Sequence, residues 1–382
     1  MHFKDHTDYG SRIKPLKRWL KNRLVGESSG NTMDSRGDES LYKPSRLGTA
    51  KCSLRTVLAG ENKAFTLEYI AGKEELPAGT KIKFWMPGQG SLGSTPQASD
   101  PKVPGYFSIE GPSHVKLSPL FDKFRVLSIK DGENPERPIK SDDMLVGPIT
   151  IGCIIERGIL KEGDRILFRV GHKSGFKWKK IAGRKEFKLI IESKDGGPIR
   201  RLPEPIRIDI LPLRTSQISA FIPGTGNKNN ASRAVVTLRD KYNNVVPENT
   251  EIICRQGKSI SKIKLVKGVS EFEFKKKQSS AERLELKIKS SSIASAKSNY
   301  STEPVNGMNL YFGDMHTHDF NSTAEGYPID CYQWARDVMR LDFQALSVQV
   351  HRWIDNEKWF LMKHMAEYFH EEGRFITFPS FE

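Results

Sequence analysis

PITIGCIIERGILKEGDRILFRVG, residues 148–171, decides the fold class of the first half of the chain. The stretch holds two apolar runs rich in isoleucine, separated by KEGD at 161–164. Glycine and aspartate between two such runs are typical of a tight turn, and β-branched residues favour strands. We therefore predict two strands here and an all-β domain around them.

Neighbouring segments show the same two-residue alternation. TKIKFWMP at 80–87 puts Ile82, Phe84 and Met86 on one face of a strand, and AFTLEYIAG at 64–72 and KEFKLIIES at 185–193 read similarly. The Gly/Pro-rich residues 88–113 predict a long surface loop. We assign residues 49–204 to one all-β domain, and residues 1–48, which are polar and rich in Gly, Ser and Asp, to a disordered tail.

Residues 205–300 predict a second all-β domain. ASRAVVTLRDKYNNVVPENTEIICR, at 231–255, contains two alternating runs around an Asn-rich turn, and VSEFEFKKK and ERLELKIKS supply later strands. Strands recurring about every ten residues suggest an immunoglobulin-like sandwich. No Cys–Trp–Cys core is present in the sequence, which argues against an antibody-type domain.

After residue 301 the sequence changes from successive strand patterns to strand patterns that alternate with helical ones. Residues 309–315, 343–350 and 374–382 read as strands, and the helical spacing of apolar residues predicts helices over 328–342 and 355–373. We expect the second helix to begin at the N-cap Asp355 and to stop at Gly373. Strand, helix, strand, helix, strand predicts parallel pairing, so we assign 305–382 to a partial α/β domain, severed after three strands.

Charge divides the chain into two unequal parts. Residues 301–382 contain 6 Lys and Arg against 13 Asp and Glu, a net charge of −7. The whole chain has a net charge of +15, so the first 300 residues have a net charge of +22. A basic part of this size attracts anionic polymers or surfaces without specificity, although lysines on exposed strands also serve solubility alone. No recognisable nucleic-acid module is present, so we expect no sequence-specific nucleic-acid binding.

Cysteine spacing and the N-terminus indicate the compartment. The four cysteines, Cys52, Cys153, Cys254 and Cys331, form no CxxC pair, which predicts reduced, mostly buried thiols. RIKPLKRWLKNRLVG at 12–26 is basic and broken by Pro15, so it predicts neither a membrane span nor a signal-peptide core. We expect a cytoplasmic protein, with export left open if a leader precedes residue 1.

YFGDMHTHD, at 311–319, carries the candidate chemistry. Functional residues of parallel α/β folds lie at the carboxyl ends of strands. The three predicted strands end at His316 and His318, at His351, and at Glu382. Imidazole and carboxylate suit zinc, manganese or iron, so these four residues are candidate metal ligands, and Asp314 is a candidate for orienting a ligand histidine.

These motifs resemble the opening of the polymerase and histidinol phosphatase (PHP) superfamily of metal-dependent phosphoesterases, over about 75 residues. The β-domains, notably at 76–87 and 236–247, resemble those that precede this domain in a bacterial group. The resemblance implies a distorted seven-stranded β/α barrel with up to three metals, in which His316 and His318 are ligands of the first motif. His351 matches a ligand histidine, and Glu382 matches the bridging carboxylate.

The chain departs from that family at two positions. Val350 stands where the family has aspartate before the second-motif histidine, and Thr323 stands where it has an acidic residue, which Glu325 could replace. The family's later ligands would lie beyond residue 382. Arg352 is a further candidate, for contact with a phosphate, and the histidines at 364 and 370 are six residues apart and predicted not to be ligands.

Three functions remain open from the sequence. The first is a divalent-metal-dependent phosphoesterase, present as an N-terminal fragment, whose metal-bound water attacks a small phosphoester. The second is a non-catalytic β-sandwich protein that binds an anionic polymer or surface and carries a degenerate barrel remnant. The third is a metal-dependent hydrolase of amides or carboxylic esters.

Overall fold

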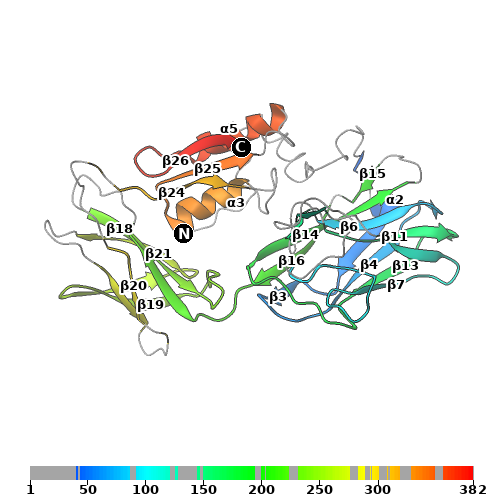
Figure 1. The fold of residues 1–382 in the computed structure, drawn as a ribbon, viewed down its shortest axis with the longest axis horizontal. Helices are drawn as coiled ribbons and strands as arrows, with labels where there is room; N and C mark the ends of the chain where they lie inside the picture. The colour runs from blue at the N-terminus through cyan, green and yellow to red at the C-terminus, as the bar shows by residue number, and fades with distance from the viewer. Residues whose placement is uncertain are drawn as a thin grey trace.

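The chain forms three parts in sequence order (Figure 1). The structure is a computed structural model. It describes residues 40–41, 44–86, 92–120, 125–127, 144–146, 149–193, 199–202, 204–222, 231–275, 283–288, 293, 295–300, 308, 310–318, 328–348 and 356–381. Two β-sandwiches are followed by a smaller unit of parallel strands and helices, as the sequence predicts.

The first sandwich packs a large sheet against a small one. The large sheet consists of β1 (Ser40–Leu41), β3 (Thr56–Leu58), β6 (Lys81–Met86), β8 (Lys116–Leu120), β11 (Ile149–Arg157), β14 (Gly183–Glu192), β15 (Ile199–Arg201) and β16 (Ile206–Leu211). The small sheet consists of β2 (Gly48–Cys52), β4 (Phe65–Ala71), β7 (Phe107–Glu110) and β13 (Arg165–Val170). Between them lies one aliphatic and aromatic core.

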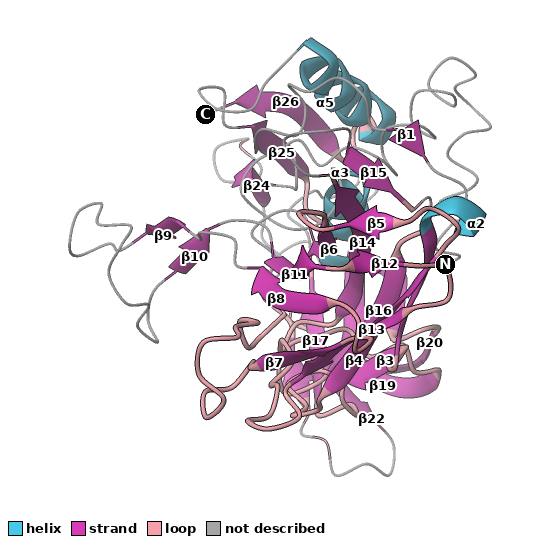
Figure 2. Cartoon of the chain, turned by 90° about the vertical axis from the view of Figure 1, so that its right-hand side faces the viewer, coloured by secondary structure: helices cyan, strands magenta, loops and turns pink. Residues whose placement is uncertain are grey.

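Two short hairpins and a helical turn complete this domain. β5 (Leu76–Pro77) pairs with β12 (Ile159–Leu160), and α2 (Pro44–Leu47) precedes β2. β9 (Arg125–Leu127) pairs with β10 (Met144–Val146), and Figure 2 shows this hairpin projecting from the body of the domain.

The predicted alternation is confirmed in the first domain. Ile82 and Phe84 of β6 are fully buried in the core, while Trp85 faces the other side of the sheet, where the Lys188 ammonium lies 5.5 Å from the centre of its ring. The predicted turn at 161–164 is also present. Its Gly163 has a φ of +84°, a conformation that favours glycine, and the Asp164 carboxylate accepts the backbone N–H of Lys161.

The first domain is longer at both ends than the predicted 49–204. Leu47, which we predicted to lie in the disordered tail, is buried in the core. β16, predicted as the start of the next domain, pairs with β14 and β3 and buries Ile206, Ile208 and Ile210 in the same core. The predicted loop at 88–113 contains the edge strand β7. Residues 1–39 of the tail lie outside the described residues.

The second domain is a seven-stranded sandwich. One sheet consists of β17 (Gln217–Phe221), β18 (Ala231–Arg239) and β21 (Val269–Lys275). The other consists of β19 (Thr250–Gln256), β20 (Ser259–Leu265), β22 (Glu285–Ile288) and β23 (Ala296–Lys297). Antiparallel sheets of three and four strands around a separate aliphatic core agree with the predicted immunoglobulin-like sandwich. The four cysteine thiols of the chain are free, two buried and two partly buried.

A turn at 240–244 joins the two sandwiches. Asn244 donates its side-chain N–H to the carbonyl of Lys180, 2.8 Å away, and its Oδ1 accepts the backbone N–H of Ala182. The buried Asp240 carboxylate accepts N–H groups within the turn and the backbone N–H of Leu213. Burial alone would raise the pKa of Asp240, but these hydrogen bonds outweigh it and lower that pKa.

The third part is a parallel sheet with helices on one face. Its strands, in spatial and chain order, are β24 (Gly313–Thr317), β25 (Phe343–Val348) and β26 (Ile376–Phe381). Its helical segments are α3 (Pro328–Gln333), the π-helix η4 (Trp334–Met339) and α5 (Asn356–Phe369). The predicted parallel pairing is confirmed, and Tyr332, Met362, Ala366 and Phe369 of the two helical segments pack in one buried cluster.

Two helix predictions need correction. The predicted helix over 328–342 changes to π-helical geometry at Trp334 and ends at Arg340, which adopts the left-handed conformation with a φ of +54°. α5 ends at Phe369 rather than at Gly373, because residues after it form a turn in which Phe375 donates its N–H to Glu371. The predicted cap Asp355 lies outside the described residues.

The third part sits on the second sandwich (Figure 1). The buried Arg340 guanidinium pairs with the Glu271 carboxylate of β21. The rings of Phe221 and Phe312 meet edge to face, with centroids 5.3 Å apart. Val235 of β18 is buried on the face of the sandwich that η4 approaches, so this sheet is covered on both sides.

Candidate metal centre

The two histidines of YFGDMHTHD lie together at the carboxyl end of β24. His316 is in the strand, His318 follows it directly, and residues two apart in an extended segment point to the same side. Their Nε2 atoms are 3.1 Å apart, and their rings meet edge to face. The structure therefore brings the two predicted ligands to one point.

The separation of the two nitrogens fits a shared metal ion. Zinc binds imidazole nitrogen at about 2.0–2.1 Å, so two ligands of a tetrahedral zinc lie about 3.3 Å from each other. The observed 3.1 Å between the two Nε2 atoms differs from this by a few tenths of an ångström, and in the absence of metal it is the distance of a hydrogen bond from His316 Nε2–H to His318 Nε2.

The backbone of β25 selects the tautomer of His318. Its Nδ1 lies 2.8 Å from the carbonyl oxygen of Ser347, and because a carbonyl only accepts, Nδ1 carries the proton. Nε2 then presents its lone pair toward His316. A histidine ligand held through its other ring nitrogen by a carbonyl is the usual arrangement at protein metal sites.

Asp314 stabilises the backbone of the same segment. Its Oδ1 accepts the backbone N–H of His316 at 2.9 Å, the geometry of an Asx turn. The carboxylate was predicted to orient a ligand ring, and the described contact instead fixes the main chain that carries the ring. Asp314 thus fixes the backbone conformation of β24 at His316.

Hydroxyl groups connect the carboxyl ends of the three strands. The Ser347 Oγ donates to the carbonyl of Met315 in β24, at 3.3 Å, and lies 3.2 Å from the Ser380 Oγ in β26. On the other face of the sheet, Gln344 donates to the Thr317 hydroxyl. Sequence reasoning missed these residues, although polar side chains within the apolar run FQALSVQV were the available signal.

The other predicted site residues lie outside the described residues: His351, Glu382, Glu325 and Arg352. β25 ends three residues before His351 and β26 ends one residue before Glu382, and Val348 pairs with Phe381 in parallel register. The carboxyl ends of β25 and β26, at Val348 and Phe381, therefore lie at the same edge of the sheet as the carboxyl end of β24. Among the described residues, no group of three or more His, Cys, Asp or Glu side chains could hold a metal.

The remaining histidines of this unit have local partners. His364 Nδ1 lies 3.3 Å from the Glu367 carboxylate on α5, and His370 Nδ1 accepts the backbone N–H of Thr377 at 3.5 Å. That these two histidines are not ligands stays a prediction.

Comparison with known proteins adds little to this geometry. Within the described part of the chain, no helix has the length and apolar character needed to cross a bilayer.

Neither a protein-family description nor a curated protein matches the chain. The D0-D1 domain of intimin is similar at 9% identity and a TM-score of 0.18, covering 66% of this chain and 96% of that one. AvmM, which catalyses macrocyclisation in alchivemycin A biosynthesis, is similar at 13% identity and a TM-score of 0.23, covering 45% of this chain and 95% of that one. Likenesses this weak carry no inference about fold or activity.

Proposed function

We propose that this chain is a divalent-metal-dependent hydrolase, with a phosphoester as substrate, and that His316 and His318 are two of its metal ligands. The observation that carries the proposal is the pair of Nε2 atoms 3.1 Å apart, with the His318 tautomer fixed by the Ser347 carbonyl. The resemblance of YFGDMHTHD to the first PHP motif supports phosphoesters over amides and carboxylic esters.

His351 and Glu382 are the further ligands that we propose, because they follow the neighbouring strands at the same sheet edge. The sequential parallel order of β24, β25 and β26, with helices on one face, supports a β/α barrel. Apolar Met315 and Phe378, both exposed on the outer strands, support a sheet that is extended or covered in the whole domain.

In the proposed reaction, the chain's own residues position the centre. A bound divalent metal would supply a water molecule of lowered pKa and would polarise the phosphoryl oxygens. Ser347 holds the His318 ring through its carbonyl, and Asp314 holds the main chain of His316. The His318 ring and the main chain of His316 are therefore fixed before metal binds, which reduces the reorganisation that binding requires.

Elemental analysis of the dialysed chain tests the proposal. We expect zinc, manganese or iron to co-purify, and His316→Ala/His318→Ala to lose it. His364→Ala/His370→Ala is the matched control, since it removes two histidines of the same unit and should keep the metal. Hydrolysis of p-nitrophenyl phosphate should follow metal content. Equal metal in the two double variants would contradict the proposal.

A further inference from the structure

The outer face of the four-stranded sheet β20-β19-β22-β23 is basic. Alternation places Ile252, Cys254 and Leu286 in the core, so their neighbours along each strand point outward. The outward residues are Ile260, Lys262 and Lys264 on β20, Glu251, Ile253 and Arg255 on β19, Glu285 and Lys287 on β22, and Lys297 on β23. Five cations and two anions give this face a net charge of +3.

Two of the five cations form ion pairs on the face. Lys262 lies 3.4 Å from Glu251, and Lys297 lies 3.3 Å from Glu285. Lys264, Arg255 and Lys287 have no acidic partner within ion-pair distance among the described residues, and all three are exposed. Their charges are available to an external anion.

Strand register places these cations in rows across the sheet. Ile253 pairs with Lys262 on one side and with Lys287 on the other, so the two lysines flank an aliphatic side chain and stand about 10 Å apart. Arg255 pairs with Ile260, which is 62% exposed, on one side and with Glu285 on the other, and Lys264 pairs with Glu251. The face therefore spreads five cations, two carboxylates and two aliphatic side chains over four strands.

This composition distinguishes among anionic partners. Single-stranded nucleic acid is held by aromatic side chains on which bases stack, and the described residues of this face include no aromatic. Insertion into a membrane needs a broad apolar surface, whereas Ile260 is the single strongly exposed apolar residue on the described part of the face. An acidic polysaccharide presents carboxylates or sulfates at intervals along its chain, and Arg and Lys side chains bind such groups without a platform for stacked bases.

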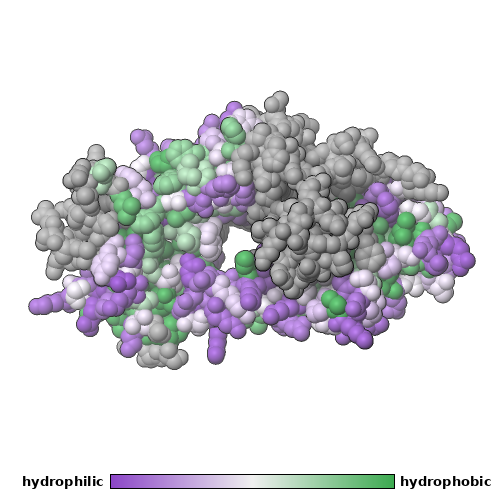
Figure 3. Space-filling model, viewed as in Figure 1, coloured by the Kyte–Doolittle hydropathy of each residue, from purple (hydrophilic) through white to green (hydrophobic). Residues whose placement is uncertain are grey.

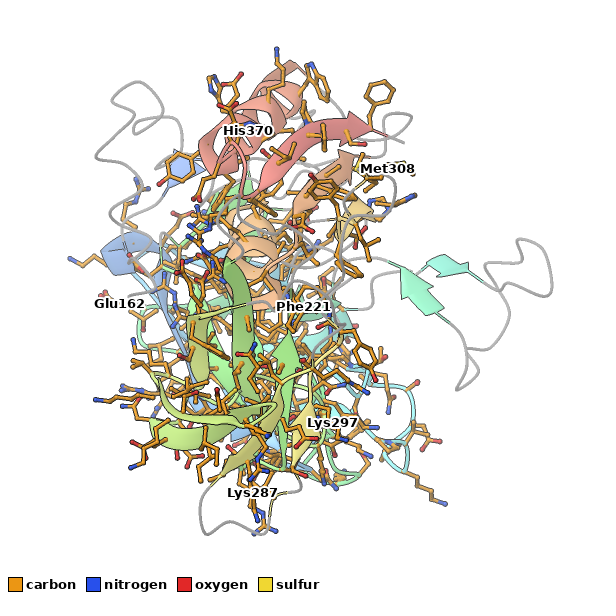
Figure 4. All side chains as sticks on the ribbon, turned by 90° about the vertical axis from the view of Figure 1, so that its left-hand side faces the viewer. Glu162, Phe221, Lys287, Lys297, Met308 and His370 are labelled. Atoms are coloured by element: carbon orange, nitrogen blue, oxygen red, sulfur yellow. The ribbon has the colours of Figure 1, made fainter. Side chains whose placement is uncertain are left out.

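We infer that this face binds an acidic polysaccharide chain, laid across the strands, with Arg255, Lys264 and Lys287 as the principal cations. Figure 4 shows Lys287 and Lys297 at the end of the molecule away from Met308 and His370 of the third part. Figure 3 shows hydrophilic and hydrophobic residues side by side over the second domain. The binding face is separate from the histidine pair and independent of the proposed hydrolase activity.

The test compares two triple variants of the full chain with equal changes in net charge. Arg255→Gln/Lys264→Gln/Lys287→Gln alters the face, and Lys73→Gln/Lys102→Gln/Lys161→Gln alters three exposed lysines of the first domain. Dissociation constants are measured for labelled polygalacturonate and heparin at several salt concentrations, beside neutral dextran, single-stranded DNA and anionic phosphatidylglycerol vesicles. Circular dichroism confirms that both variants fold.

We expect the face variant to bind the acidic polysaccharides at least tenfold more weakly, with a reduced salt dependence, and the control variant to change by less than threefold. Preference for polygalacturonate or for heparin then identifies carboxylate or sulfate as the recognised group. Equal weakening in both variants would show attraction by net charge alone and overturn the inference. Tighter binding of DNA or vesicles than of either polysaccharide would also overturn it.

Discussion

Single contacts prepare the histidine pair at the end of β24. His318 donates Nδ1–H to the Ser347 carbonyl, and the His316 backbone N–H donates to Asp314. The Ser347 carbonyl is a main-chain group that any residue at this position would supply, whereas the contact to the His316 backbone needs the carboxylate side chain of Asp314. The orientation of the His318 ring is therefore a property of the paired strands.

Ser347→Ala tests the role of the Ser347 carbonyl separately from that of its hydroxyl. The variant keeps the acceptor for His318, so we expect the Nδ1–H tautomer to persist in long-range ¹H–¹⁵N correlation spectra. It loses the hydroxyl contacts to Met315 and Ser380, which should lower the free energy of unfolding by about 1 kcal/mol. A change to the Nε2–H tautomer would show that the hydroxyl, and not the carbonyl, orients the ring.

Arg340 combines a favourable ion pair with an unfavourable backbone. Its φ of +54° lies in the left-handed region, which costs a non-glycine residue about 1 kcal/mol, while its guanidinium pairs with Glu271. Both Arg340→Ala and Arg340→Gly should destabilise the contact with the second sandwich. Because glycine relieves the backbone strain, urea unfolding should show Arg340→Gly to be more stable than Arg340→Ala by about 1 kcal/mol. Equal stabilities would contradict this account.

At the scale of elements, the small sheet of the first sandwich carries a buried carboxylate between two strands. Glu68 of β4 receives Lys51 Nζ of β2 at 2.8 Å and Arg165 Nε of β13 at 2.7 Å. Burial alone would raise the pKa of Glu68, but the hydrogen bonds and charges of Lys51 and Arg165 outweigh it and lower that pKa. The carboxylate thus links three neighbouring strands.

The lowered pKa of Glu68 predicts that the free energy of unfolding decreases at acid pH. The contribution is fully present above the ordinary glutamate pKa of about 4.3 and is lost as pH falls through the lower pKa of the folded state. Glu68→Gln should cost about 2 kcal/mol at pH 7, and this cost should shrink as pH is lowered below about 4. Urea midpoints measured from pH 7 to pH 3 check both statements.

Glu110→Gln is the matched control for that titration. Its carboxylate pairs with Arg169 on the same sheet but is 62% exposed, so its removal should cost less than about 1 kcal/mol. A cost for Glu68→Gln that does not change with pH would contradict the role assigned to its charge.

Sequence reasoning succeeded where one element decides the outcome. Alternation along β6 fixes which of Ile82 and Trp85 faces the main core, and helical spacing gives the buried face of α5. It failed where a distant partner decides. The pairing of β16 with β3 depends on a contact that no local pattern encodes. The early end of α5 has a different cause, a local turn at 371–375 that precedes and includes the predicted stop at Gly373. For the site, the His316–His318 motif was visible in the sequence. The role of Ser347 was not, because every residue has a main-chain carbonyl and the sequence does not mark which one accepts a hydrogen bond.

At the scale of the whole molecule, side-chain contacts hold the second sandwich at both of its borders. Asn244 bridges to the main chain of the first domain, and Arg340 reaches Glu271 from the third part. Among the described residues, cysteine cross-links play no part in these junctions, since the thiols are free. The arrangement of the three parts therefore depends on a few polar groups and on aromatic contacts such as that of Phe221 with Phe312.

Asn244→Ala tests the first of these junctions. It removes the hydrogen bonds to Lys180 and Ala182, and we expect the two sandwiches to reorient, with a larger radius of gyration in small-angle X-ray scattering. The free energy of unfolding should fall by about 2 kcal/mol, since buried partners are left unsatisfied. Asn249→Ala is the control, because Asn249 accepts the Lys267 N–H within one domain. Unchanged scattering in Asn244→Ala would contradict the bridging role.

The pairing of β3 with β16 also bears on how the chain is made. Thr56 lies beside Asp209, and Ser40 beside Arg200, so the first sandwich closes only after residue 211 has left the ribosome. β24 and β25, in contrast, meet across a connection of 25 residues, 318 to 342, and can pair soon after synthesis. The nascent first domain spends the longest time with unpaired strand edges. In a cell that makes this protein, chaperones would be needed there first.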